Sequence, residues 1–187
     1  MDPSDAPKIV VLALGNLIRS DDAIGLFALR HLEKDPRLPL FVSLVEGGTK
    51  GLELVPYICD ASCLLVLDAV DVGATPGTLF RIAGEDLRSI PGNGNVHGLA
   101  LADILNALRM MGHQPQEIVL LGVQPATTEL GTTLSAPLQD ALPALLKAAI
   151  AELSRWAYSV PDERREDGEP GENTVAISVK ASQFGPE

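Results

Sequence analysis

Aspartate and histidine are residue types that commonly bind divalent metal ions. Three of them each follow a predicted strand or precede a predicted helix: Asp22, Asp68 and His97. Two carboxylates and one imidazole form a ligand set suited to nickel, zinc, iron or manganese. Three protein ligands leave positions on the ion open for water or substrate, as in catalytic sites. These residues are therefore our candidate site, both for metal binding and for catalysis.

Each of the three residues also has a purely structural explanation. Asp22 can be a carboxylate in the first turn of a helix, Asp68 can form a turn, and His97 can cap a helix at the surface. The neighbouring carboxylates Asp21 and Asp71 are expected to be a cap and a turn residue. The residue pattern alone leaves both explanations open.

The sequence around Asp22 predicts a strand, a turn and a helix. Ile9–Leu14 is a continuous apolar run rich in β-branched residues, which is typical of a strand covered on both faces. Gly15-Asn16 then predicts a tight turn. A helix is expected from Asp22 to Lys34, with Ser20 or Asp21 as its N-cap. Asp22 is thus expected near the carboxyl end of a strand, where open parallel sheets bind ligands.

Asp68 and His97, like Asp22, lie next to the ends of predicted strands or helices. Asp68 follows a second buried apolar run, Cys63–Leu67. His97 directly precedes a helix expected from about Leu99 to Met111. A last long helix is expected from about Pro137 to Tyr158.

The alternation of strands and helices predicts an α/β fold, a three-layer α/β/α sandwich with a mixed, mainly parallel sheet in a single domain. A strand at Thr78–Ile82 follows its predecessor too closely for a helical crossover, so we expect at least one antiparallel pair. We assign residues 1–160 to this domain. Residues 161–187 are rich in Asp, Glu, Gly and Pro, and we expect a largely disordered acidic tail there.

Composition narrows the classes of function. The 187 residues carry a net charge of −11, which disfavours binding to nucleic acid or to an anionic membrane surface. The apolar run near the amino terminus is too short for a signal peptide or a membrane span, so we expect a cytoplasmic protein without membrane insertion. Cys59 and Cys63 are expected to be small buried apolar residues, because two thiols alone make neither a zinc quartet nor a C-x-x-C pair.

Several other chemistries lack their motifs. The sequence contains neither G-x-G-x-x-G nor G-x-x-x-x-G-K-[ST], so it predicts no phosphate-binding loop of those types. It also lacks the G-x-S-x-G motif of hydrolases with a serine nucleophile. A cysteine nucleophile would need an exposed Cys63, which instead begins an apolar strand.

Five separated blocks of the sequence carry a family resemblance. They are LALGNLIRSDDAIGL, EGGTKGLELVPYI, LLVLDAVDVGATPGTL, VHGLALADILNALRMMG and LLGVQPATTELGTTLS. In this order and spacing they resemble the hydrogenase maturation proteases, the endopeptidases of nickel-iron hydrogenase assembly. The resemblance covers about Ile9 to Ala157.

The resemblance implies a function and a role for the candidate site. In that family a mixed sheet lies between helices, and three residues bind nickel; by residue-for-residue match these are Asp22, Asp68 and His97 here. The family removes a short carboxy-terminal extension from the precursor of the hydrogenase large subunit after nickel insertion. The implied partner is therefore this precursor, and the implied cofactor is the nickel that the substrate carries, although other divalent ions can occupy such a site.

Two other functions stay open at this point. A nickel-binding assembly factor would dock the immature subunit without cutting it, although the sequence lacks the His-rich tract of a nickel store. Metal-free proteolysis by paired aspartates would need Asp22 and Asp68 close enough to share a proton.

One block departs from the family pattern. The sequence usually written Asp-Gly-Gly-Thr reads Glu-Gly-Gly-Thr here and begins at Glu46. The longer side chain puts in doubt any role that needs the aspartate. We expect Glu46 to cap the turn or to contact the substrate at the rim of the site.

Overall fold

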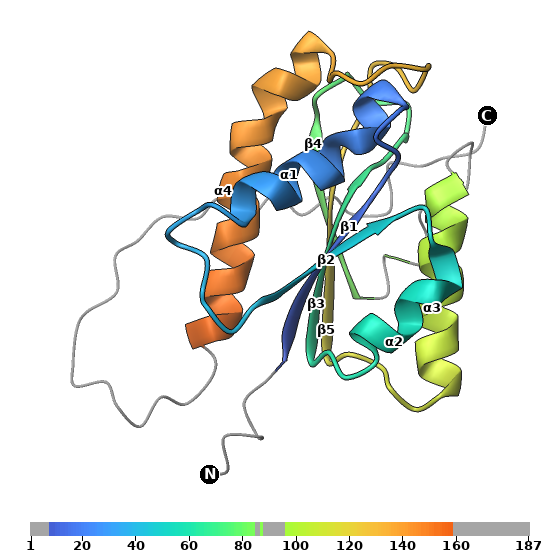
Figure 1. The fold of residues 1–187 in the computed structure, drawn as a ribbon, viewed down its shortest axis with the longest axis vertical. Helices are drawn as coiled ribbons and strands as arrows, with labels where there is room; N and C mark the ends of the chain where they lie inside the picture. The colour runs from blue at the N-terminus through green and yellow to red at the C-terminus, as the bar shows by residue number, and fades with distance from the viewer. Residues whose placement is uncertain (1–7, 85–86, 88–95, 159–187) are drawn as a thin grey trace.

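The structure, a computed structural model, describes residues 8–84, 87 and 96–158, and for residues 96–100 only the backbone. Its five-stranded sheet has the order β2-β1-β3-β5-β4 (Figure 1). The strands are β1 (Ile9–Leu14), β2 (Ser43–Gly48), β3 (Cys63–Ala69), β4 (Leu79–Ala83) and β5 (Glu117–Val123). Only β4 runs antiparallel to its neighbour, β5. The predicted mixed, mainly parallel sheet and its antiparallel strand are confirmed.

Helices cover both faces of the sheet and form two separate cores. They are α1 (Ile24–Leu32) and α4 (Ala136–Tyr158) on one face, and α2 (Val55–Ile58) and α3 (Val96–Met110) on the other (Figure 1). Alternate residues of β1 enter the two cores, Val11 on the α1 side and Leu12 on the α3 side. Every residue of β1 and β3 is buried, as the continuous apolar runs predict. The predicted three-layer sandwich is confirmed.

Two helix starts differ from the prediction. The helix expected from Asp22 begins at Ile24, and a 3₁₀ turn, η2 (Ser20–Ala23), precedes it. Neither Ser20 nor Asp21 is an N-cap, because Ser20 has a positive φ of 46° and the structure shows no side-chain cap on either helix. The later helix begins at Val96, so His97 lies in its first turn rather than ahead of it.

Three further expectations concern the last helix, membrane-spanning helices and the acidic tail. The last helix starts at Ala136 and contains Pro143 in its interior. None of the helices in the described ranges is long and apolar enough to span a bilayer. The acidic tail expected at 161–187 lies outside the described residues.

A charged network joins α4 to the sheet. Glu152 of α4 accepts hydrogen bonds from Arg81 of β4 at 2.5 Å and from Arg155 at 3.0 Å. Glu117 of β5 accepts from Arg155 at 2.8 Å and from the indole of Trp156 at 3.0 Å. Burial would raise the pKa of Glu152, but the hydrogen bonds from Arg81 and Arg155 outweigh it and hold this pKa below its usual value. The hydrogen bonds from Arg155 and Trp156 likewise lower the pKa of Glu117.

We expect Glu152→Gln to lower the free energy of unfolding at neutral pH by about 1–2 kcal/mol, because the amide carries no charge to pair with Arg81 and Arg155 and its NH₂ group cannot accept a guanidinium N–H. Folding lowers the pKa of Glu152, so its contribution is full above the ordinary value of 4.5 and is lost as the pH falls through the folded value. Urea unfolding should therefore show a parent–variant difference that shrinks in acid. Glu33→Gln, at an exposed position after α1, is the control. A difference that stays constant down to about pH 3 would contradict this account.

Candidate functional site

Two glycines allow the turn that carries Asp22 to lie against the sheet. Gly15 ends β1 with a φ of 125°, and a Cβ there would overlap the carbonyl oxygen of Asp22. A Cβ at Gly25, in the first turn of α1, would overlap the carbonyl oxygen of Leu67 and lie 2.7 Å from that of Leu14. The backbone of η2 and α1 thus approaches the carboxyl ends of β1 and β3 more closely than any larger residue would permit.

The structure places Asp22 and Asp68 at this edge of the sheet. Asp68 is the second-to-last residue of β3, and η2, which contains Asp22, contacts that strand. Each residue is only 3% exposed. One carboxylate oxygen of Asp68 accepts the backbone N–H of Ala69 at 2.8 Å. Two buried carboxylates at the carboxyl ends of these strands, where parallel sheets bind ligands, make this end of the sheet the candidate site.

The backbone of His97 belongs to α3, which covers the opposite face of the sheet from α1. The helix α3 that carries it packs through Leu101, Ile104 and Leu108 on the core that includes Leu12 and Leu14. Its amino end lies at the same end of the sheet as the carboxyl ends of β1 and β3 (Figure 1). No three His, Cys, Asp or Glu residues with described side chains are grouped to hold a metal, and the His97 side chain is not among those described. The three-residue site therefore stays a prediction.

Asp21 has a different role from its neighbour Asp22. Its carboxylate is fully buried and binds the segment that follows β5. One oxygen accepts the N–H groups of Ala126 at 2.8 Å and Thr127 at 3.1 Å and the hydroxyl of Ser135 at 2.8 Å, and the other accepts the N–H of Ser135 at 2.7 Å. Four hydrogen bonds offset the cost of burying this charge. Asp21 is thus a clamp between two loops at the site rather than the expected helix cap.

Gln124 holds a third loop and was not predicted from the sequence. This side chain, 5% exposed, accepts the N–H groups of Val72 at 2.9 Å and Ala74 at 3.1 Å and donates to Asp71 at 2.9 Å. Asp71 also accepts the N–H of Gly73, as expected for a turn residue. The sequence feature that could have identified Gln124 is a polar residue directly after a buried apolar run. Asp68 has the same feature.

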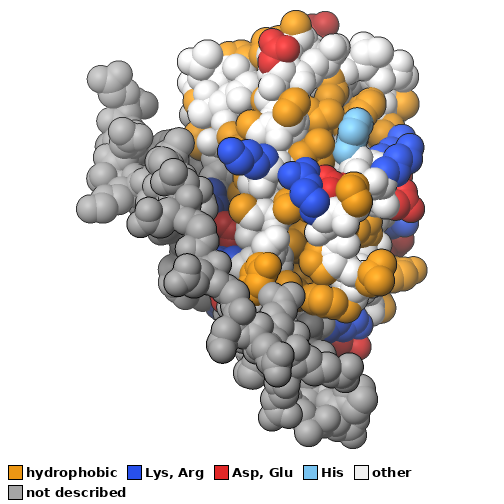
Figure 2. Space-filling model, turned by 90° about the vertical axis from the view of Figure 1, so that its left-hand side faces the viewer, with side chains coloured by type: hydrophobic (Ala, Val, Ile, Leu, Met, Phe, Trp, Pro, Cys, Tyr) orange, Lys and Arg blue, Asp and Glu red, His pale blue; other side chains and the backbone are white. Residues whose placement is uncertain are grey.

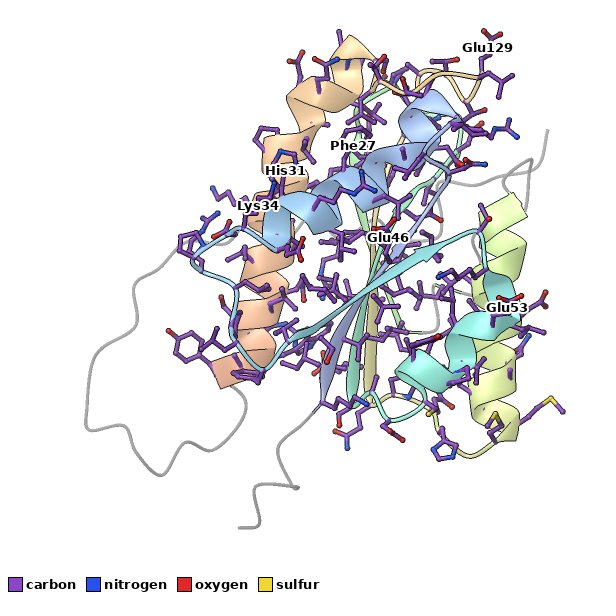
Figure 3. The ribbon with its side chains drawn as sticks, in the orientation of Figure 1. Phe27, His31, Lys34, Glu46, Glu53 and Glu129 are labelled. Atoms are coloured by element: carbon purple, nitrogen blue, oxygen red, sulfur yellow. The ribbon has the colours of Figure 1, made fainter. Side chains whose placement is uncertain are left out.

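Glu46 lies on β2 beside α1, where Figure 3 labels it. Its carboxylate pairs with Arg30 at 3.4 Å, and both side chains are about half exposed, 51% and 48%. The structure therefore shows a surface ion pair and no turn cap. His31, one turn after Phe27 in Figure 3, bonds the Phe27 carbonyl oxygen through Nδ1 at 2.8 Å and lies on the exposed side of α1.

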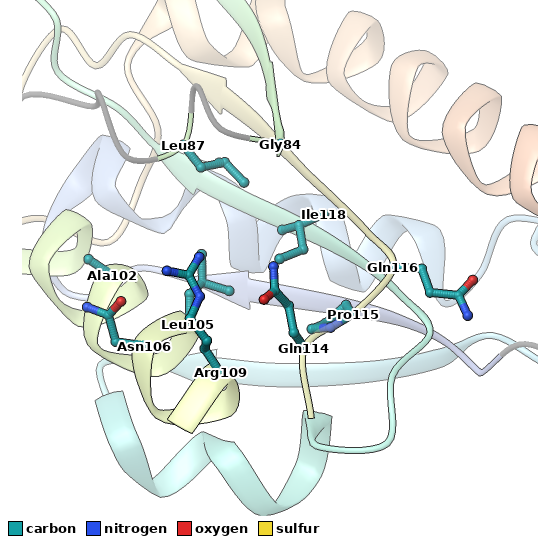
Figure 4. A pocket seen from close by; sticks show the side chains of 10 residues that line it. All are labelled: Gly84, Leu87, Ala102, Leu105, Asn106, Arg109, Gln114, Pro115, Gln116 and Ile118. Carbon is teal, nitrogen blue, oxygen red and sulfur yellow. The ribbon is translucent and has the colours of Figure 1, made fainter. Parts of the chain in front are cut away.

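Neither the two cysteines nor a cavity at the other end of the sheet is a better candidate for the functional site. Cys59 and Cys63 are free thiols, and burial raises the pKa of Cys63, which makes it a poor nucleophile. A cavity of about 420 Å³ lies between α3 and the beginning of β5, beside Leu105 and Ile118 (Figure 4). It lies toward the amino end of β5, whereas Asp22 and Asp68 lie at the carboxyl end of the sheet.

Comparison with known proteins agrees with this architecture. A family model described as hydrogenase maturation protease matches residues 28–152, and the chain belongs to that family. This membership makes it a peptidase. It is similar to the hydrogenase expression/formation protein HupD of Rhizobium leguminosarum bv. viciae, with 32% identity over 86% of this chain and 81% of that protein.

The chain is also similar to proteins of Escherichia coli. The hydrogenase 2 maturation protease of strain K12 is 35% identical over 75% of this chain and 90% of that protein. The solved structure of the hydrogenase maturating endopeptidase HybD from E. coli superposes with a TM-score of 0.76 at 31% identity, over 79% of this chain and 93% of that one. The fold predicted from the sequence is thus that of a known maturation endopeptidase.

We expect Asp21→Asn to lower the free energy of unfolding by about 2–4 kcal/mol, because an amide NH₂ would face at least one N–H donor that the carboxylate now satisfies. The change should also increase amide exchange in residues 126–135. Asp60→Asn, the same substitution at an exposed position, should be neutral. Equal melting temperatures for Asp21→Asn and the parent would contradict the clamp.

Proposed function

We propose that this chain removes the carboxy-terminal extension from a nickel-iron hydrogenase large-subunit precursor after nickel insertion. We further propose that it senses the nickel carried by that substrate through Asp22, Asp68 and His97, and that it acts in the cytoplasm. The observation that carries the proposal is the burial of Asp22 and Asp68 at the carboxyl edge of the sheet in a maturation protease fold.

The chemistry of the residues supports a metal-bearing substrate. Carboxylate oxygens and a neutral imidazole nitrogen are ligands that suit nickel. A divalent ion can polarise a scissile carbonyl or activate a water molecule. The role of this chain is to hold the substrate's nickel, and with it the adjacent peptide, at the carboxyl ends of β1 and β3.

The net charge of the chain fits this class of partner. A charge of −11 favours a basic or neutral protein surface and a bound cation over nucleic acid.

The decisive experiment incubates the purified protein with nickel-loaded and with nickel-free precursor and weighs the products by mass spectrometry. Loss of the extension from the nickel-loaded precursor alone is expected. Stable binding without a change in mass would instead identify an assembly factor. Equal cleavage of both precursors would identify metal-free proteolysis and refute nickel sensing.

We expect Asp22→Ala, Asp68→Ala and His97→Ala each to reduce processing of nickel-loaded precursor at least about a hundredfold, because two remaining ligands hold a divalent ion poorly. Combined substitutions should add little further loss. Asp71→Ala, at an exposed turn, should keep most of the activity, and circular dichroism should show that all variants are folded. Processing at the parental rate by any one of the three variants would remove that residue from the site.

We expect Glu46→Asp to change the processing rate by less than about twofold, because an exposed ion pair such as Glu46–Arg30 contributes little to stability and lies outside the proposed ligand set. Glu53→Asp, a matched change at another exposed glutamate, is the control (Figure 3). A hundredfold loss confined to Glu46→Asp would place this carboxylate against the reacting peptide.

A further inference from the structure

The strand β2 is an open edge of the sheet. It ends the strand order and, among the described residues, only β1 pairs with it (Figure 1). Its residues are mostly exposed or half-buried, whereas those of β1 and β3 are all buried. Successive backbone N–H groups in a strand point alternately to its two sides, so about half of those in Ser43–Gly48 point away from β1.

Edge strands usually carry residues that prevent pairing with another chain, and β2 has few such residues. Ser43–Gly48 contains no Pro and no Lys, which commonly block edges. Its one charged residue, Glu46, reaches Arg30 of α1 and so lies over a face of the sheet. Hydrophobic side chains reach the surface on the α1–α4 side of the molecule (Figure 2), and just before β2 the exposed ones are Leu40 and Phe41. This edge is therefore suited to an added strand with apolar side chains.

The end of β2 leads directly to the candidate site. The carbonyl oxygen of Gly48 accepts the N–H of Gly15 at 3.2 Å, and Gly15 packs against the backbone of Asp22. The other edge strand, β4, also reaches this end of the sheet, because Leu79 pairs with Val123, but β5 lies between it and β3. Arg81 also ties β4 to Glu152 of α4. Of the two edge strands, β2 is therefore the one that lies next to β1 and the turn that carries Asp22.

We propose that β2 is the docking strand for the substrate: an extended segment of the hydrogenase precursor, next to the bond that is cut, pairs with the open edge of Ser43–Gly48. Only an extended polypeptide satisfies alternating N–H and C=O groups along an edge, which fixes the chemistry of the occupant. Six residues of strand guide about 20 Å of substrate toward the carboxyl edge of the sheet. This inference rests on the proposed function and specifies how that substrate is held.

Proline substitution tests the pairing, because proline removes one backbone N–H and its ring obstructs an added strand. Of Leu44→Pro and Val45→Pro, one removes an N–H that faces β1 and the other an N–H that faces the open edge. The variant that keeps the parental fold by circular dichroism is compared with the alanine variant at the same position. We expect its KM for nickel-loaded precursor to be about tenfold higher than that of the alanine variant, with kcat within about twofold.

Equal KM values for the folded proline variant and its alanine control would overturn the docking inference while the proposed function stands. If the parental protein does not cut the precursor at all, the proposed function itself fails. The two failures are therefore distinguishable.

Hydrogen exchange gives a second, independent measurement on the unmodified protein. The outward amides of residues 43–48 should exchange readily in the free chain and become protected when nickel-loaded precursor is added and the reaction is quenched before cleavage is complete. Residues 79–83 of β4 should not change. Unchanged exchange in 43–48 would overturn the inference even if both proline variants unfold. Full protection without precursor would also overturn it, because the chain's own segments or a second copy would then cover the edge.

Discussion

The close backbone contact at Gly15 and Gly25 is the constraint on which the site depends. A Cβ at either position would overlap a carbonyl oxygen, of Asp22 in one case and of Leu67 in the other. Without side chains there, η2 and the start of α1 can lie directly on the carboxyl ends of β1 and β3. Asp22 is thereby buried beside β3, whose second-to-last residue is Asp68. A larger residue at either glycine would lift η2 and the start of α1 away from the ends of these strands.

Adjacent aspartates in η2 have different surroundings because consecutive side chains point in different directions. Asp21 points into the loop after β5, where four donors hold its charge. Asp22 lies at the edge of the sheet near β3. The clamp made by Asp21 fixes the turn that presents Asp22, and Gln124 fixes the loop after Asp68 in the same way. A site held by buried hydrogen bonds needs little reorganisation when a substrate binds.

The two edges of the sheet differ in how they are held. At β4, a partly buried ion pair with α4 and the network around Glu117 tie the sheet to the longest helix. At β2, the ion pair between Glu46 and Arg30 is exposed, and the edge is open within the described chain. The β4 edge, which is tied to α4, lies away from the end of β1. The open β2 edge lies next to the end of β1. This asymmetry fits the proposed docking of a protein substrate along β2.

The sequence by itself determined the elements whose signals are local. The apolar run Ile9–Leu14 is β1 to the residue, and Asp68 lies at the end of β3 as expected, because periodicity and hydrophobicity are properties of neighbouring residues. Only the tertiary structure decided the role of Asp21, whose partners lie 105 to 114 residues away. It also decided the strand order, in which β2 rather than β1 forms an edge. Long-range hydrogen bonds and strand order depend on how distant segments pack, and no local pattern records that packing.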